Sequence, residues 1–164
     1  FWNEFIEKTG RDNEDKCSGD LTFESQGFQN DSKVALILSG KKTAFFSALS
    51  SFLIDSEPLP LSGELYMVFD RSNNPVCIIE IDSVEIVPFC EVTWEMAQKE
   101  GEDSSLNEWK EKQKENLEDE GNILGFSFSE DLKLVYQTFR VVYTNFLILT
   151  FELFAFFHFF SQRE

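Results

Sequence analysis

Apolar residues recur at helical spacing in two segments near the start of the chain. The first segment is a short amphipathic helix that Gly10 ends. The second begins at Asn30 or Asp31 as its N-cap and stops at Gly40. The polar stretch from Arg11 to Asp20 between them is predicted to be a loop. The apolar positions that define the two helices are Trp2, Phe5, Ile6, Val34, Ile37 and Leu38.

Beyond residue 42 the pattern becomes that of strands. Thr43 to Phe52 is rich in Phe, Ser and Thr and is predicted to be a strand or an irregular strand and loop. Leu65 to Phe69 follows a loop with two prolines, and Val76 to Val87, as one bent strand or two short ones, forms a hairpin with it. Ile123 to Phe128 and Leu134 to Tyr143 are predicted to be the last two strands.

A helical insertion interrupts these strands. Thr93 caps a short helix from Trp94 to Glu100 that Gly101 closes. Ser105 and Glu108 have the spacing of a capping box, which opens a charged helix that runs to about Gly121. Helices followed by strands with a helical insertion favour an α+β fold with a mostly antiparallel sheet or a small β-barrel.

The composition favours one globular domain of 164 residues, with 42% hydrophobic residues and a formal net charge of −16. Such an acidic chain opposes generic binding to phosphate backbones, because that affinity comes from basic residues that displace counterions. Any nucleic-acid contact must therefore be local. The segment from Ser32 to Ile54 offers a place for it, since it holds three lysines and no acidic residue.

The three cysteines are widely spaced and lack a Cys/His cluster, so we expect no metal, no disulfide framework and a reduced, cytoplasmic setting. No secretory signal, phosphate loop or dinucleotide fingerprint is visible, and we expect no cofactor. The Phe-rich segment from Asn145 to Phe160 is shorter than the ~20 residues that cross a bilayer. The sequence leaves open whether it is a membrane-associated tail, a further buried helix or an extension foreign to the domain.

Seven segments, in their order and spacing, resemble the ASCH domain, a PUA-like fold, and in particular its small bacterial YhfF-type branch. The resemblance covers residues 1–143 and leaves residues 144–164 outside it. It implies a small, mostly antiparallel β-barrel flanked by helices, with a cleft beside the lysine motif. The segments that carry it are FWNEF at 1–5, ALILSGKKTA at 35–44, EPLPLSGELYMVFD at 57–70, NPVCIIEIDSVEIVPFCEVT at 74–93, AQKEGE at 97–102, SLNEWK at 105–110 and FSEDLKLVYQTFRVVY at 128–143.

The same resemblance implies a role with RNA or nucleosides, and some small members of the family are amidohydrolases that remove an acyl group from N4-acetylcytidine. Carried over by motif, their lysine falls on Lys42 and their glutamate on Glu100. Their threonine position is occupied by Phe45, which removes the hydroxyl nucleophile. Thr43 and Ser47 are the nearby hydroxyls, and Ser47 replaces the threonine only if the substrate lies one pleat, about 7 Å, further along.

The chemistry of these residues supports two hypotheses. A lysine in a partly dry cleft acts as a base or an electrostatic clamp, with Glu100 as its proton partner. Phe45 beside Lys42 is suited to stacking a base while the ammonium takes an oxygen, although core packing explains a phenylalanine equally well. Lys41 either joins the site or is a solvated residue at a helix end. Glu100 is either a site residue or one of many surface acids.

We therefore expect a protein that binds a nucleoside or single-stranded RNA in a cleft around Lys42, with Lys41, Thr43, Phe45, Ser47 and Glu100 contributing and with little affinity for duplexes. The alternative is a metal-independent amidohydrolase with Lys42 and Glu100 as its catalytic residues. A member of the family whose site has decayed is a third possibility.

Overall fold

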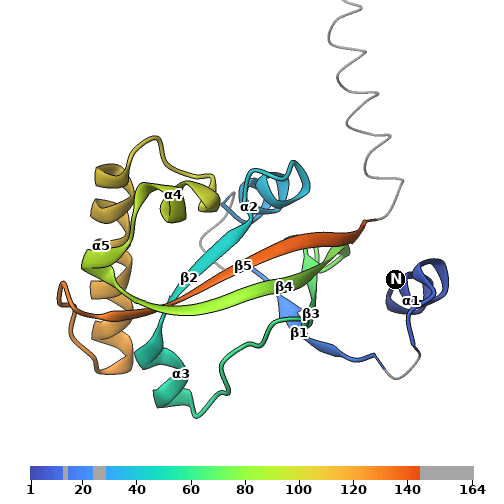
Figure 1. Ribbon diagram of the computed structural model, residues 1–164, viewed down its shortest axis with the longest axis horizontal. Helices are drawn as coiled ribbons and strands as arrows, with labels where there is room; N and C mark the ends of the chain where they lie inside the picture. The colour runs from blue at the N-terminus through green and yellow to red at the C-terminus, as the bar shows by residue number, and fades with distance from the viewer. Residues whose placement is uncertain (13–14, 24–28, 145–164) are drawn as a thin grey trace, which may run out of the picture. The chain divides into compact units, whose positions relative to one another are not determined.

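The computed structural model describes residues 1–12, 15–23 and 29–144, with the side chains of residues 29 and 30 left out. Figure 1 labels the helices and strands along the chain. The predictions for the Phe-rich segment after residue 144 lie outside the described residues. The elements are α1 (Trp2–Thr9), β1 (Cys17–Leu21), α2 (Gln29–Leu38), β2 (Ala44–Ala48), α3 (Leu49–Asp55), β3 (Leu65–Phe69), β4 (Pro75–Pro88), the 3-10 helix η1 (Phe89–Glu91), α4 (Trp94–Ala97), the 3-10 helix η2 (Gln98–Glu100), α5 (Leu106–Leu124) and β5 (Lys133–Thr144).

The described strands form one five-stranded sheet in the order β1-β3-β4-β5-β2. β1 runs parallel to β3, with Leu21 opposite Val68, and β2 runs antiparallel to β5, with Phe45 opposite Gln137. The predicted α+β class is confirmed. The sheet is mixed, and because β1 and β2 stand at its two ends it is not closed into the barrel that we expected.

The fold divides into two compact units. Of the described residues, unit 1 comprises 1–12, 15–23, 29–34, 65–79 and 141–144, and unit 2 comprises Ala35–Glu64 and Glu80–Arg140. In unit 1, α1 buries Phe5 and Ile6 against Leu65 and Ile78, so its apolar stripe meets the strands of that unit.

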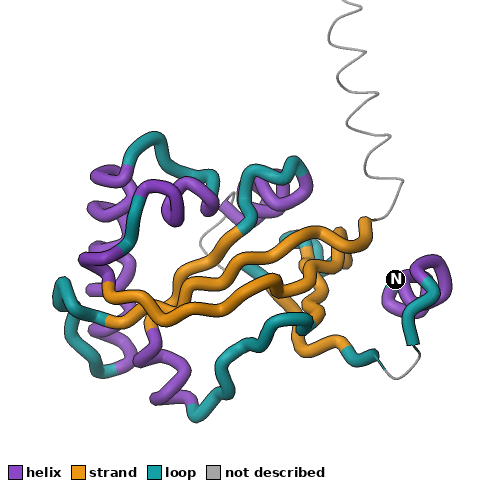
Figure 2. The backbone as a smooth tube through the Cα atoms, in the orientation of Figure 1, coloured by secondary structure: helices purple, strands orange, loops and turns teal. Residues whose placement is uncertain are grey.

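The core of unit 2 is built around Trp109 of α5, which is fully buried. Its indole lies 4.9 Å from the ring of Phe46 in β2 and 5.8 Å from the ring of Phe89 in η1, measured between centroids. Figure 2 shows the helices of this unit in purple, with α4 next to α5. Because Trp109 fixes α5 against β2, the polar face of α5 is also held in place.

Several elements agree with the sequence pattern. β3 has the predicted bounds, and β4 is a single strand with one more residue at each end than predicted. Gly10 ends α1 in the left-handed conformation with φ of 65°. The side-chain oxygen of Ser105 accepts a hydrogen bond from the Glu108 N–H at 3.2 Å, as an N-cap does.

Three further predictions, besides the closed barrel, were wrong. β1 lies within the polar stretch that we expected to be a loop, and it forms by parallel pairing with β3 although its own sequence, CSGDL, has low strand propensity. The segment from Thr43 to Phe52 is a strand only to Ala48, after which α3 begins. Residues 123–128 are the end of α5 and a loop, and Ile123 is 83% exposed instead of packed in a sheet.

Gly121 explains why α5 runs beyond its predicted end. The helix continues to Leu124 and stops at Gly125, whose φ is 89°. The Phe126 N–H then donates to the Gly121 carbonyl at 3.1 Å, which folds the chain back onto the helix. A Cβ atom on Gly121 would lie 2.4 Å from the Phe126 carbonyl oxygen, so the glycine is needed for close approach and not as a cap.

Gly121→Ala is expected to lower the free energy of unfolding by about 1–3 kcal/mol, because the added methyl group collides with backbone. Helix propensity alone predicts that the free energy of unfolding increases by about 1 kcal/mol, so the sign of the measured change decides between the two effects. Urea unfolding measures the change. Asn122→Ala, one residue along on the exposed side of the helix, is the control and should change stability by less than about 0.7 kcal/mol. Equal stability of the two variants would contradict the steric account.

Candidate functional site

The lysine motif begins as the C-terminal cap of α2. Gly40 takes the left-handed conformation with φ of 72°. The backbone N–H groups of Lys41 and Lys42 then both donate to the Leu36 carbonyl, at 2.9 and 3.0 Å. These bonds satisfy a carbonyl that the helix leaves without a partner and turn the chain toward β2.

A second segment, from Thr93 to Gly101, lies directly against this motif. Thr93 caps α4 by accepting from the Met96 N–H, and η2 continues to Glu100. The Thr43 N–H donates to the Lys99 carbonyl at 2.7 Å. Gly101 has φ of 75°, and a Cβ atom there would lie 2.8 Å from the Lys41 carbonyl oxygen. The glycine therefore permits a backbone approach that places Glu100 beside Lys42.

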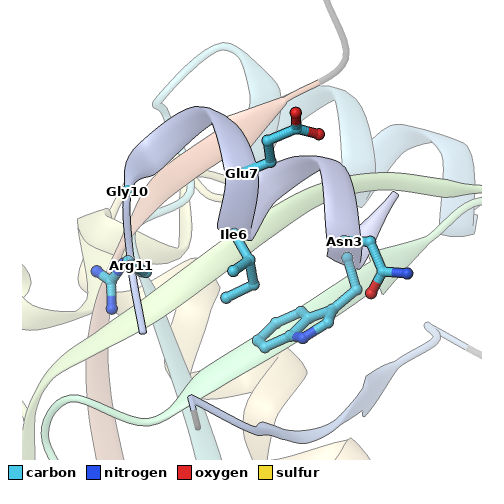
Figure 3. A pocket seen from close by; sticks show the side chains of 6 residues that line it. Asn3, Ile6, Glu7, Gly10 and Arg11 are labelled. Atoms are coloured by element: carbon cyan, nitrogen blue, oxygen red, sulfur yellow. The ribbon is translucent and has the colours of Figure 1, made fainter. Parts of the chain in front are cut away.

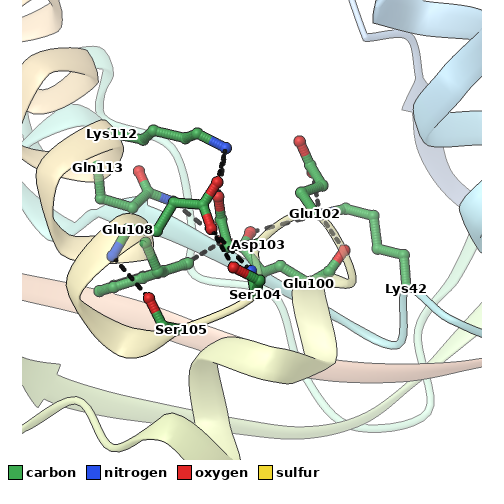
Figure 4. Close-up of polar contacts among 10 residues, drawn as sticks. Lys42, Glu100, Glu102, Asp103, Ser104, Ser105, Glu108, Lys112 and Gln113 are labelled. Atoms are coloured by element: carbon green, nitrogen blue, oxygen red, sulfur yellow. Dashed lines mark hydrogen bonds and ion pairs between the residues drawn. The ribbon is translucent and has the colours of Figure 1, made fainter.

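Lys42 is the centre of a buried polar network, shown in Figure 4. Its side chain is 3% exposed, and its Nζ lies 2.9 Å from Glu102 Oε1, 3.4 Å from Glu100 Oε1 and 3.4 Å from the Glu100 carbonyl oxygen. The two carboxylates supply the compensation that a desolvated ammonium requires.

The other carboxylate oxygen of Glu100 is held by α5. Trp109 Nε1 donates to Glu100 Oε2 at 2.7 Å, and Gln113 Nε2 donates to the same oxygen at 3.0 Å. Two donors on one carboxylate oxygen fix the orientation of the carboxylate. Glu100 is thus locked between Lys42 on one side and two neutral donors on the other.

Lys42 and Glu100 are in contact and both are buried. Among the residues that the structure describes, three polar or charged side chains are classed as buried, namely Lys42, Glu100 and Gln137. Gln137 lies opposite Phe45 across the β2–β5 pair. A folded protein rarely buries charge without a reason of stability or function, so this cluster is the candidate site.

The remaining predicted site residues lie around the cluster. Lys42 Nζ stands 5.3 Å from the centre of the Phe45 ring, which stacks on Phe139 at 4.5 Å. One face of Phe45 is therefore covered by another ring. Ser47 is half-buried two residues further along β2, and the exposed Lys41 contributes only its backbone to the contacts described above.

The turn after Glu102 is pinned to the start of α5. Glu108 Oε2 accepts from the N–H of Ser104 at 2.9 Å and from its hydroxyl at 2.6 Å. These bonds, followed by the contact with Lys112, lower the pKa of Glu108 to about 2. Lys112 also pairs with Asp103. The two residues that follow Glu102 are consequently held in place.

Two site residues escaped the sequence prediction. Glu102 lies two positions beyond Glu100 in a segment dense in acids, so charge alone did not distinguish it. Gln113 follows Trp109 by four residues on α5, and this helical spacing is the signal that could have placed it on the same face.

A separate hollow of about 410 Å³ lies beside α1 in unit 1 (Figure 3). It contains none of the predicted site residues. Its lining consists of Trp2, Asn3, Ile6, Glu7, Gly10 and Arg11.

The described part of the chain contains no cluster of His, Cys, Asp and Glu with the makeup of a metal site. Within residues 1–12, 15–23 and 29–144, none of the helices combines the length and the apolar character that a membrane span needs.

Comparison with known proteins defines the family. The family model for the ASCH domain matches residues 20–143. The crystal structure of an ASCH domain from Lactobacillus crispatus JV V101 is similar with a TM-score of 0.80 and 31% identity, over 87% of this chain and 92% of that one. A protein from Enterococcus faecalis V583 is similar with a TM-score of 0.77 and 29% identity, over 86% and 85%. No match is found among curated proteins. The chain belongs to the ASCH domain family, as its motifs predicted.

Lys42→Met is expected to lower the free energy of unfolding by about 3–5 kcal/mol, because it leaves Glu100 as a buried carboxylate without its counter-charge. Adding Glu100→Gln removes that charge and keeps an oxygen for Trp109, so the double variant should be more stable than Lys42→Met alone. Urea unfolding at neutral pH tests both statements. Lys114→Met, on the exposed side of α5, is the control and should change stability by less than about 0.5 kcal/mol.

Proposed function

We propose that this protein binds a nucleoside, or the base and ribose of one nucleotide in single-stranded RNA, around Lys42. The observation that carries the proposal is the buried contact of a lysine with a glutamate beside the ring of Phe45, with a buried glutamine opposite that phenylalanine in the neighbouring strand. Nucleobases offer both donors and acceptors at their edges, and this set provides the complementary partners. Membership in a family generally linked to RNA supports the same choice.

The charge distribution favours a small or single-stranded ligand. The exposed Lys41 and the network at Lys42 form a local site on a chain of net charge −16. Long nucleic acids are bound largely through many phosphates, and such binding weakens when the protein is acidic. The proposal therefore includes little affinity for duplex RNA or DNA. The proposal also includes a cytoplasmic setting, which the three free thiols support.

A saturating concentration of cytidine, or of a single-stranded RNA pentamer, is expected to raise the melting temperature of the protein, since a ligand stabilises the folded state that it binds. The rise should disappear in the Lys42→Met/Glu100→Gln variant, which keeps the core but loses the charged pair. Lys114→Met should retain it, and an RNA duplex should give no comparable rise. An unchanged shift in the double variant would remove Lys42 from the binding site.

The Lys42–Glu100 contact also favours a second function, that of an amidohydrolase acting on N-acylated cytidine-like nucleosides. The amine and the carboxylate lie 3.4 Å apart, which is within reach of a proton exchange. In this alternative Lys42 acts as the base and Glu100 carries the proton. Phe45 stands where the related hydrolases have threonine, so a covalent route would need another hydroxyl, for which Ser47 is the candidate two residues further along β2.

Hydrolysis of N4-acetylcytidine, followed by ultraviolet absorbance, separates the two functions. The binding proposal predicts no turnover by the natural chain. Phe45→Thr restores the hydroxyl, and activity that appears only in this variant would mean that the scaffold is competent and the nucleophile is missing. Turnover by the natural chain that is lost in Glu100→Gln would establish the amidohydrolase in its place. If neither the natural chain nor Phe45→Thr hydrolyses the compound or binds it, the site has decayed.

A further inference from the structure

We infer that Glu102 is a displaceable cover on Lys42: its carboxylate occupies the place on the ammonium that a ligand oxygen takes, and it swings away when the ligand binds. The part of this inference that concerns the ligand rests on the function proposed above. It makes Glu102 a residue that determines specificity, because a carboxylate that stays near the site disfavours ligands with an anionic group at that position.

The first argument is the hydrogen-bonding capacity of Lys42. An ammonium group has three donors. The structure gives Lys42 Nζ three oxygen partners, which are Glu102 Oε1 at 2.9 Å and two atoms of Glu100 at 3.4 Å each. The donors are therefore already used, and a ligand reaches Lys42 only by replacing one of these oxygens.

The second argument identifies which oxygen can leave. One Glu100 partner is a backbone carbonyl within η2, and the other belongs to a carboxylate that Trp109 and Gln113 hold from behind. Glu102 differs, since its side chain is 33% exposed and its carboxylate has one polar partner, Lys42, among the contacts of the described residues. A partly exposed carboxylate regains water when it leaves, and a ligand oxygen takes over its place as an acceptor for the buried ammonium.

The third argument concerns the kind of motion. The chain is fixed before Glu102 by the close approach of Gly101 to Lys41. After Glu102 it is fixed by the hydrogen bond from Ser104 to Glu108 and by the ion pair between Lys112 and Asp103. Figure 4 shows Glu102 on this short turn, with its side chain directed toward Lys42. Because the backbone is held on both sides, uncovering Lys42 needs only a rotation of one side chain.

The charges around the ammonium set the selectivity. Lys42 contributes +1, and Glu100 and Glu102 contribute −1 each, so the cluster carries −1 in total. A carbonyl oxygen of an uncharged base replaces one acceptor without adding charge. A phosphate oxygen in the same place would bring a second negative charge next to Glu100 and near the displaced Glu102, which is unfavourable at low effective dielectric.

The cover can be tested without any ligand. Exchange of the Lys42 ammonium protons with water, measured by nitrogen-detected NMR on lysine-labelled protein, should be at least ~5-fold faster in Glu102→Ala than in the natural chain. Glu95→Gln removes one negative charge from the exposed side of α4 and should leave the rate unchanged. An unchanged exchange rate in a folded Glu102→Ala protein would overturn the inference, whatever the protein binds.

Ligand titration tests the replacement. Cytidine is expected to bind Glu102→Ala roughly 5-fold more tightly than the natural chain, because no carboxylate has to be displaced. Glu102→Gln keeps an acceptor and loses the charge. The affinity for cytidine 5′-monophosphate should therefore increase more in this variant than the affinity for cytidine does. If the natural chain binds cytidine and neither variant binds either ligand more tightly, the inference fails while the proposed function stands. If no variant binds either ligand although exchange is faster, the proposed function fails, and with it the claim that a ligand takes the place of Glu102.

Discussion

A lysine ammonium that is almost completely removed from water must be compensated, and the structure of unit 2 follows from meeting that requirement at Lys42. An uncompensated charge in a protein interior costs several kcal/mol, so Glu100 has to stand beside it. Glu100 is in turn buried and depends on donors from α5. The position of α5 rests on the core around Trp109, so one aromatic residue serves both the packing and the electrostatics.

The position of Glu100 relative to Lys42 also depends on a close contact between two backbone segments. Glu100 reaches Lys42 because the backbone around Gly101 touches the backbone of the lysine motif, at a distance that leaves no space for a Cβ atom. The hydrogen bond from Thr43 to the Lys99 carbonyl fixes the two segments in register. Small rearrangements of this contact would therefore move the carboxylate relative to the amine. The distance between Lys42 and Glu100 thus depends on how closely the two glycine-containing turns pack against each other.

The sequence predicted the parts of this arrangement that local patterns control. Thr93, Gly101 and Ser105 are cap signals, and the structure uses each of them as a cap. The pairing of Lys42 with Glu100 came from the motif resemblance alone, because no local rule joins residues so distant in the chain. Glu102 was missed since an acidic residue among many acids carries no distinguishing signal until the turn that positions it is known.

Where tertiary pairing overrides local preference, the sequence predictions failed. β1 has low strand propensity and exists because β3 provides the partner. Ile123 has the side chain of a strand residue but lies exposed on the last turn of a helix, since the reversal at Gly121 requires the helix to extend that far. The absence of a closed barrel has the same origin, because strand order depends on long-range contacts that periodicity does not encode.

The separation of Lys42 and Glu100 along the chain also has a consequence for how the protein acquires its site. Their contact closes a loop of 58 residues, and the entropy of that closure is recovered only when the intervening strands and helices have formed. A segment from Glu100 to Gln113 contains the donors that hold Glu100, but it lacks the ammonium that completes the cluster. During synthesis the ammonium therefore remains hydrated until residue 100 has emerged and docked against the lysine motif.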